Sequence, residues 1–244
     1  MTVFSPHDRV LVSPRHLAGA GIDHLGDATS PLIHLFGWHH EYDRDTGRIT
    51  VSSPDEGLVV NFNSRHTRGQ WWSIAHHEPF WEVRFSRRTP IEAIAAVTQS
   101  LPQLHGDPRH AGSMPLTTGT PADIAHTGGW TRTPPGGFTS PDGHCTLAHH
   151  PGADTAWTVT HSILDGVDTH WIATFTQNTP EQLVAQFLTH LTTTTPVERA
   201  YREIPYLAHS YARIAPVNTA AVNPHVHHAA AQTSQQPTTT PHRR

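Results

Sequence analysis

Residues 81–90 read WEVRFSRRTP, and residues 171–180 repeat the pattern ninety positions later as WIATFTQNTP. Both copies have Trp at the first position, Val or Ala at the third and Phe at the fifth. This alternation is typical of a β-strand with one face in the core. The Thr-Pro pair that closes each copy precedes a helical pattern of apolar residues, and Pro is favoured at the first position of a helix. The stretch therefore predicts a strand followed by a helix, twice in one chain.

The same doubling extends to the tryptophans and to a short polar motif. Six of the seven tryptophans fall into three pairs with separations of 85 to 92 residues, namely Trp38 and Trp130, Trp72 and Trp157, and Trp81 and Trp171. Ser-Pro-Asp at residues 53–55 recurs at residues 140–142. A period near 90 residues indicates a duplicated domain rather than a solenoid of short repeats.

Each copy contains the same series of local signals. A short helical segment, at 31–36 and at 122–127, precedes a Gly-Trp pair, and alternating runs then predict about four strands. Thr89, Pro90 and Glu92 have the spacing of a capping box at the start of the closing helix. We expect an α+β fold of two homologous domains, each a roughly four-stranded antiparallel meander with a short leading helix and a closing helix packed on the sheet.

Composition divides the chain into five parts. Pro, Gly and Thr are frequent between the two copies, and the C-terminal stretch is rich in Thr, Gln, His and Pro, a composition that does not bury a core. The expected parts are a first repeat at 8–104, a linker at 105–120, a second repeat at 121–195, a C-terminal helical extension at 196–214 and a disordered tail at 215–244. Pro205 is expected to kink or split the extension.

Charge and cysteine content limit the classes of function. The 244 residues carry a formal net charge of −4, which argues against a protein that coats nucleic acid through bulk positive charge. The single cysteine excludes an internal disulfide framework and a paired-cysteine metal motif. The chain starts without a signal-like segment and has no apolar run of membrane-spanning length. We therefore expect a cytoplasmic protein without a membrane span, and the absence of Lys beside abundant Arg indicates a GC-rich genome.

The duplicated Ser-Pro-Asp, the Gly-Trp pairs at 37–38 and 129–130, and the order of Trp-containing strand, Thr-Pro and helix resemble the SPDY-motif domain. The segment 12–19 is also similar to the usual start of that family. The family is a domain of unknown function from high-GC filamentous bacteria, usually with two copies per chain. The resemblance therefore implies a two-copy architecture, and it implies no activity or catalytic residue. The fourth position of the motif holds Glu56 and Gly143 instead of Tyr.

Ser-Pro-Asp itself predicts a turn, because it falls between two strand candidates in each copy. Pro fixes φ, and the Asp side chain can bond to the backbone ahead of it. A binding role for the motif is the alternative.

The chain has 23 histidines, several of them in adjacent pairs. Adjacent residues of a strand point to opposite faces, whereas metal ligands must converge. His76 and His161 occupy matching strand positions, which favours a packing or hydrogen-bonding role. A zinc site of His39, His76 and Glu41 would support a His-dependent metal hydrolase. Because no ligand-spacing or nucleophile motif is present, we expect no metal and no cofactor, and no catalytic residue is assigned.

The two copies differ in charge. Residues 30–104 hold seven Arg and eight acidic residues, whereas residues 120–200 hold two Arg and seven acidic residues. Trp71 is the tryptophan without a counterpart, and it alternates away from Trp72 onto the other face of the sheet. An exposed Trp beside Arg can stack on bases or contact phosphate. The candidate binding residues are Arg65, Arg68, Trp71, Arg84 and Arg87.

Three interpretations of this Arg/Trp face remain open. The face is buried against the acidic second copy or in a homo-oligomer, or it binds nucleic acid or another anion, or it is ordinary solvated surface. The leading hypothesis is a non-enzymatic binding or protein-interaction module, with an unknown protein partner or self-association. The alternative is a nucleic-acid-associated protein that uses this face, and the third hypothesis is the metal hydrolase.

Overall fold

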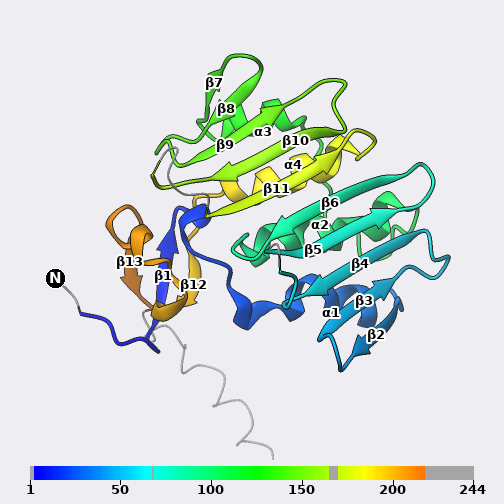
Figure 1. Cartoon of the computed structure of the whole chain (residues 1–244). Helices are drawn as coiled ribbons and strands as arrows, with labels where there is room; N and C mark the ends of the chain where they lie inside the picture. Colours follow the sequence, from blue (N-terminus) through cyan, green and yellow to red (C-terminus); the bar gives the residue numbers. More distant parts are fainter. Residues whose placement is uncertain (1–2, 68, 165–169, 218–244) are drawn as a thin grey trace, which may run out of the picture.

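Ten antiparallel strands form one continuous sheet in the computed structural model, which describes residues 3–67, 69–164 and 170–217 (Figure 1). The first copy contributes β2 (His39–Asp43), β3 (Arg48–Ser52), β4 (Leu58–Asn63), β5 (Gln70–His76) and β6 (Trp81–Ser86). The second copy contributes β7 (Thr131–Thr133), β8 (Gly137–Thr139), β9 (Cys145–His149), β10 (Thr155–His161) and β11 (Trp171–Thr176). The strand order is β2-β3-β4-β5-β6-β11-β10-β9-β8-β7, so the last strands of the two copies meet at the centre.

The prediction of two separate domains, each a four-stranded meander, is wrong. Each copy has five strands, and β6 pairs with β11 over three residue pairs centred on Arg84 and Thr174. The pairing covers the two strand edges that separate domains would leave open, and an open edge exposes a row of unpaired backbone groups. The alternation of apolar residues indicates which face of a strand is buried, but it carries no information about which edge is paired.

Two side-chain hydroxyls extend the central pairing symmetrically. Glu82 N–H donates to Thr176 Oγ1 at 2.7 Å, and Ile172 N–H donates to Ser86 Oγ at 2.9 Å. Ser86 and Thr176 occupy equivalent positions of the two copies, so the junction has approximate two-fold symmetry. Each hydroxyl satisfies a backbone donor next to the β6–β11 ladder.

Four α-helices cover one face of the large sheet, and the opposite face carries none of them (Figure 1). They are α1 (Gly26–His34), α2 (Ile91–Leu104), α3 (Pro121–Thr127) and α4 (Glu181–Thr192). The leading and closing helices therefore lie close to the segments that the sequence patterns predict. Within the described ranges, no helix is long and apolar enough to cross a membrane.

The core lies between the sheet and these helices, and its centre is aromatic. Phe85 of β6, Phe175 of β11 and Phe187 of α4 are fully buried. The Phe187 ring stacks on Phe85 with centroids 5.4 Å apart and meets Phe175 edge-on at 5.8 Å. Such pairs contribute about 0.5–1.5 kcal/mol beyond the area that they bury. One helix of the second copy thus packs on the central strands of both copies.

The capping box expected at the start of α2 does not form. The N-cap is Pro90, and no side chain caps the helix there. Glu92 instead binds Arg199, whose Nη1 and Nη2 donate to the two carboxylate oxygens of Glu92. A buried arginine requires a carboxylate more strongly than a helix end requires a cap, because an unpaired buried charge costs several kcal/mol.

A second sheet of three strands lies beside the large one (Figure 1). Its order is β12 (Val197–Ala200), β1 (Arg9–Ser13) and β13 (Arg213–Pro216). The chain therefore brings its N-terminal strand between two strands from its C-terminal part.

The prediction of a helical extension at 196–214 is wrong. This segment contains β12, two 3-10 helices at Tyr201–Glu203 and Tyr206–Ser210, and the beginning of β13. β1 supplies backbone partners on both of its edges, and Pro205 cannot donate a bond inside a helix. Of the tail expected at 215–244, the first residues belong to β13, and residues 218–244 lie outside the described residues.

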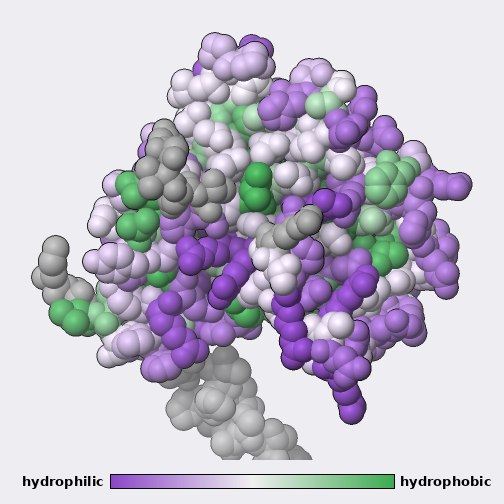
Figure 2. Space-filling model, viewed as in Figure 1, coloured by the Kyte–Doolittle hydropathy of each residue, from purple (hydrophilic) through white to green (hydrophobic). Residues whose placement is uncertain are grey.

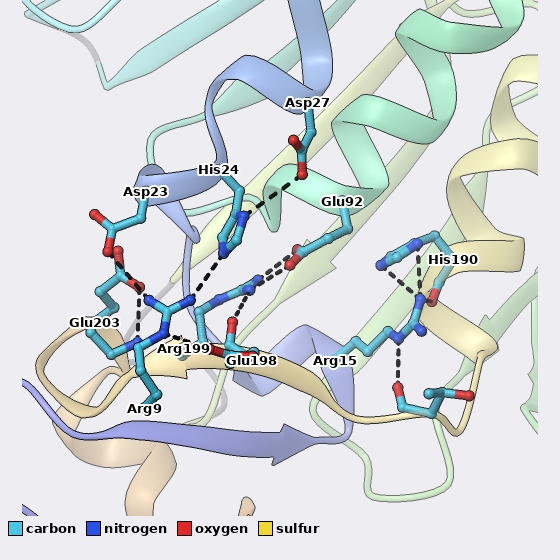
Figure 3. Close-up of polar contacts among 12 residues, drawn as sticks. Arg9, Arg15, Asp23, His24, Asp27, Glu92, His190, Glu198, Arg199 and Glu203 are labelled. Carbon is cyan, nitrogen blue, oxygen red and sulfur yellow. Dashed lines mark hydrogen bonds and ion pairs between the residues drawn. The ribbon is translucent and has the colours of Figure 1, made fainter. Parts of the chain in front are cut away.

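Polar contacts hold the small sheet to the helices of the large one (Figure 3). Arg199 of β12 is fully buried and reaches Glu92 of α2. Arg15, which follows β1, donates from Nε to Thr195 O at 2.7 Å and lies 2.9 Å from the ring nitrogens of His190 in α4. Removing one partner of a buried ion pair costs about 3–5 kcal/mol. The Arg199–Glu92 pair therefore fixes where the small sheet sits.

We expect Trp81→Ala and Trp171→Ala each to lower the free energy of unfolding by about 3–5 kcal/mol, because both rings are almost fully buried on the helix side of the sheet. Trp71→Ala is the matched control, since Trp71 is only half-buried and packs at the margin of the core, beside residues of the opposite face. Its loss should be clearly smaller. Urea unfolding followed by circular dichroism measures all three, and an equal loss for Trp71→Ala would overturn the assignment of faces.

Candidate functional site

Both Ser-Pro-Asp motifs form turns with the same hydrogen bonds. In the first copy, Ser53 Oγ donates to Asp55 Oδ1 at 2.6 Å and accepts from the first backbone N–H of β4 at 2.9 Å. Ser140 and Asp142 repeat both contacts at the same distances, with the first N–H of β9 as donor. The prediction of a turn is confirmed.

Each motif aspartate also binds a histidine from outside the motif. Asp55 Oδ2 lies 2.6 Å from Nε2 of His105, which directly follows α2. Asp142 Oδ2 lies 2.7 Å from Nε2 of His16, in a 3-10 helix after β1. A nucleophilic serine needs a base at its own oxygen. Here the group at the serine oxygen is a carboxylate whose pKa is far below its ordinary value, so it is a weak base. The arrangement ties distant segments to the turn.

The same contacts keep both aspartates ionised. Hydrogen bonds from the motif serine and from His105 hold the pKa of Asp55 well below its ordinary value. Burial favours the neutral form of Asp142, but the hydrogen bond and the charge of His16 outweigh it, and the pKa of Asp142 is also far below its ordinary value. Each carboxylate therefore stays an acceptor throughout the physiological pH range.

His161 of β10 is buried next to the His16–Asp142 pair. Its ring stacks on Trp171 at 5.5 Å and lies 5.6 Å from the ring of His16. Burial lowers the pKa of His161 to about 3, so its ring is neutral at pH 7. His76, at the equivalent position of the first copy, stacks on Trp81 at 5.7 Å. The packing role predicted for these two histidines is confirmed.

The zinc site of the hydrolase hypothesis is not formed. His39 and Glu41 lie on β2 at the edge of the sheet, whereas His76 lies on β5. With β3 and β4 between them, these strands are about 14 Å apart, and zinc ligands lie only about 2 Å from the metal. Among the residues that the structure describes, no group of three or more His, Cys, Asp or Glu side chains could hold a metal ion.

The face of the large sheet opposite the helices is turned toward the viewer in Figure 2 and is open to solvent. Trp71 of β5 and Arg84 of β6 lie on this face, and Arg87 directly follows β6. The guanidinium carbon of Arg87 lies 5.0 Å from the centroid of the Trp71 ring, a cation–π distance. The two copies lie edge to edge in one sheet, so burial of this face against the second copy is wrong.

A groove of about 340 Å³ crosses this face over β3 to β6, and we call it the outer groove. Its lining includes Arg48, Asn61, Trp71, Ser73, Glu82 and Arg84. Arg84 pairs with Glu82 at 2.7 Å, and Arg48 Nε donates to Asn61 Oδ1 at 3.0 Å. The groove is thus a polar surface with fixed charges around one half-buried indole ring.

The other predicted residues lie outside the groove. Arg65 reaches the hairpin between β2 and β3, where its Nη1 donates to Asp45 O at 2.5 Å. Arg68 lies outside the described residues. The sequence interpretation missed Arg48 and Asn61. Strand alternation places Asn61 on the outer face, but only the register of β3 against β4, with Arg48 opposite Asn63, lets Arg48 reach Asn61 diagonally.

The outer groove belongs to the first copy alone. Strand pairing aligns Asn61, Trp71, Glu82 and Arg84 of the first copy with Ala148, Ala156, Ile172 and Thr174 of the second. Side chains in the second copy are small or uncharged at these positions. Because both copies build the same five-stranded frame, the frame itself does not require a tryptophan or an ion pair there.

Two segments of the chain, residues 52–108 and 139–197, match the family model of SPDY, a domain of unknown function (DUF317). Each match contains one Ser-Pro-Asp turn, three of the central strands and the closing helix. The two matched segments are consistent with two copies of the domain per chain. No curated protein and no solved structure matches the chain.

We expect Asp142→Asn to lower the free energy of unfolding by about 1–3 kcal/mol, because it weakens the charged hydrogen bond to a buried histidine. Asp55→Asn is the matched control in the first copy, where the side chain is 58% exposed and solvent replaces part of the contact. Its loss should stay below about 1 kcal/mol. Chemical denaturation of both variants measures the difference, and equal losses would show that burial of the second site contributes nothing.

We also expect stability to fall as pH drops from about 6.5 toward 4. Burial lowers the pKa of His161 to about 3 and that of His190 to about 4, against 6.5 for an ordinary histidine. Below pH 6.5 these histidines therefore bind protons in the unfolded chain but not in the folded chain. Each histidine then lowers the free energy of unfolding by up to about 1.4 kcal/mol for every pH unit that the pH falls. Above pH 6.5 both contributions are complete.

Urea unfolding near pH 5 and near pH 7.5 checks this slope. His161→Gln should reduce the difference between the two pH values, whereas His39→Gln, at an exposed position, should leave it unchanged. A wild-type stability that is flat over this range would contradict the assignment.

Proposed function

We propose that the chain is a non-enzymatic binding protein and that the outer groove of its first copy holds a protein partner. The difference between the two copies supports this proposal. On one strand frame, the first copy places a tryptophan and an ion pair where the second copy has small or uncharged side chains. A binding role accounts for side chains that the frame does not need.

The surroundings of Trp71 favour a protein surface over stacked bases. Phe62 meets the Trp71 ring edge-on at 5.9 Å, and Arg87 lies over the ring, so the indole does not offer two free faces. Glu82 places a carboxylate in the groove, where a phosphate backbone would be repelled. Tryptophan and arginine are also the side chains that most often dominate the energy of protein–protein interfaces.

The charges around the groove specify the chemistry of the partner. Arg48, Arg84 and Arg87 lie in or beside the outer groove, and Glu82 is the carboxylate that lines it. Within the described residues, neither Arg48 nor Arg87 forms an ion pair. The partner should therefore present carboxylates, and its binding should weaken with salt.

A nucleic-acid ligand is the second candidate, supported by the same arginines beside an aromatic ring. Self-association through the open face is a further form of the binding hypothesis. The proposed location is the cytoplasm, where the free and buried Cys145 would remain reduced.

Quantitative pull-down from lysate of the source cells, with and without nuclease, tests the proposal. The wild type should retain a partner protein in the presence of nuclease. Arg84→Ala and Trp71→Ala should each capture at least tenfold less of that protein. Thr174→Ala changes the equivalent position of the second copy and should retain it. Loss of all captured material on nuclease treatment would favour the nucleic-acid alternative, and equal retention by Arg84→Ala and Thr174→Ala would reject the outer groove as the binding site.

A further inference from the structure

A cleft of about 600 Å³ lies where the small sheet meets the large one. One wall is the segment after β12, from 201 to 206 with His209, and a second wall is the loop 19–22. Arg87 and Arg88, just beyond β6, form the third wall. The most hydrophilic side chains on this view of the molecule include a group between the two sheets (Figure 2). We call this pocket the arginine cleft.

The arginine cleft has an excess of positive charge. Arg87, Arg88 and Arg202 line it, against the single carboxylate of Glu203. In the described parts of the chain, none of the three guanidinium groups has a carboxylate within ion-pair distance. Three arginines thus meet one carboxylate in the lining of the cleft, in a chain whose formal net charge is −4. An anion is therefore the ligand that the cleft would attract.

The two outer arginines are held by histidines rather than by acids. Arg88 Nη1 lies 3.3 Å from His170 Nδ1, and Arg202 Nη1 lies 3.1 Å from His7 Nδ1. Each guanidinium has five N–H donors in a planar fork, so one such contact leaves most donors available to a ligand. Bidentate binding of a phosphate uses this fork geometry.

The walls of the cleft are tightly packed and carry aromatic rings. A Cβ added at Gly19 would lie 2.4 Å from Glu203 O, so the loop is in direct contact with the opposite wall. Tyr201 stacks on His209 at 4.8 Å, and Tyr206 is 84% exposed. The cleft is thus preformed, with the exposed phenol ring of Tyr206 in its lining, 6.0 Å from the ring of His209.

We propose that the arginine cleft binds a soluble phosphate ester of mononucleotide size, with its phosphate held by Arg88 and Arg202 and a planar ring stacked on Tyr206. The volume falls in the range typical of small-molecule sites. The ligand and the site differ from those of the outer groove, although Arg87 borders both. A short, bounded cleft between two sheets suits a small ligand better than a polymer.

Isothermal titration of the full chain with adenosine 5′-monophosphate tests the proposal, with inorganic phosphate, adenosine and a single-stranded DNA decamer as comparison probes. The monophosphate should bind and should raise the melting temperature, adenosine should do neither, and phosphate should bind more weakly than the monophosphate. Arg88→Ala and Arg202→Ala should each weaken binding of the monophosphate at least tenfold. Tyr206→Ala should weaken binding of the monophosphate but leave binding of inorganic phosphate unchanged.

Arg132→Ala is the matched control, because it removes the same charge from an exposed position on β7. Arg132→Ala should bind the monophosphate with the same affinity as the wild type. Arg84→Ala, which changes the outer groove, should also bind it with wild-type affinity. Circular dichroism confirms that each variant is folded. Three results would each overturn the proposal. The wild type fails to bind at millimolar monophosphate, or Arg202→Ala and Arg132→Ala bind the monophosphate with equal affinity, or the decamer binds more tightly than the monophosphate.

Discussion

The pairing of β6 with β11 is the contact on which the arrangement of the whole molecule depends. It places the two five-stranded halves edge to edge, so that both have their apolar face on the same side. All four α-helices then share one layer, and Phe187 of the second copy packs on central strands from both copies. The opposite face remains open across both halves. The outer groove is therefore accessible because the copies pair through their edges and not through their faces.

A second constraint is the buried Arg199–Glu92 pair. Arg199 is fully buried in the small sheet, and its charge is compensated by a carboxylate on the closing helix of the first copy. A Cβ added at Gly21 would lie 2.7 Å from the guanidinium carbon of Arg199, so the neighbouring loop is packed around this side chain. The small sheet consequently has one position relative to the large one. The arginine cleft between them is a result of that fixed position.

Local patterns in the sequence were sufficient for most individual elements. The repeated tryptophans located the central strands, and Ser-Pro-Asp located the turns, because these features depend on residues within a few positions of one another. Long-range partners were not accessible in this way. Glu92 fits a capping box by spacing, yet its partner is Arg199, 107 residues away. The outer face of Trp71 followed from alternation, whereas the groove around it required the register of four strands. The C-terminal segment looked helical because its pairing partner, β1, lies at the other end of the chain.

The two Ser-Pro-Asp turns show how one motif supports different architecture in each copy. In both, the serine and one carboxylate oxygen complete the turn, which leaves the second oxygen free for an outside donor. In the first copy the partner of the second oxygen is His105, which directly follows its own closing helix. In the second copy the partner is His16, which follows β1 and belongs to neither repeated strand set. The motif therefore acts as a fixed acceptor to which a histidine from a nearby segment attaches. In the second copy, that attachment joins the segment after the N-terminal strand of the small sheet to the large sheet, as a second contact beside the Arg199–Glu92 pair.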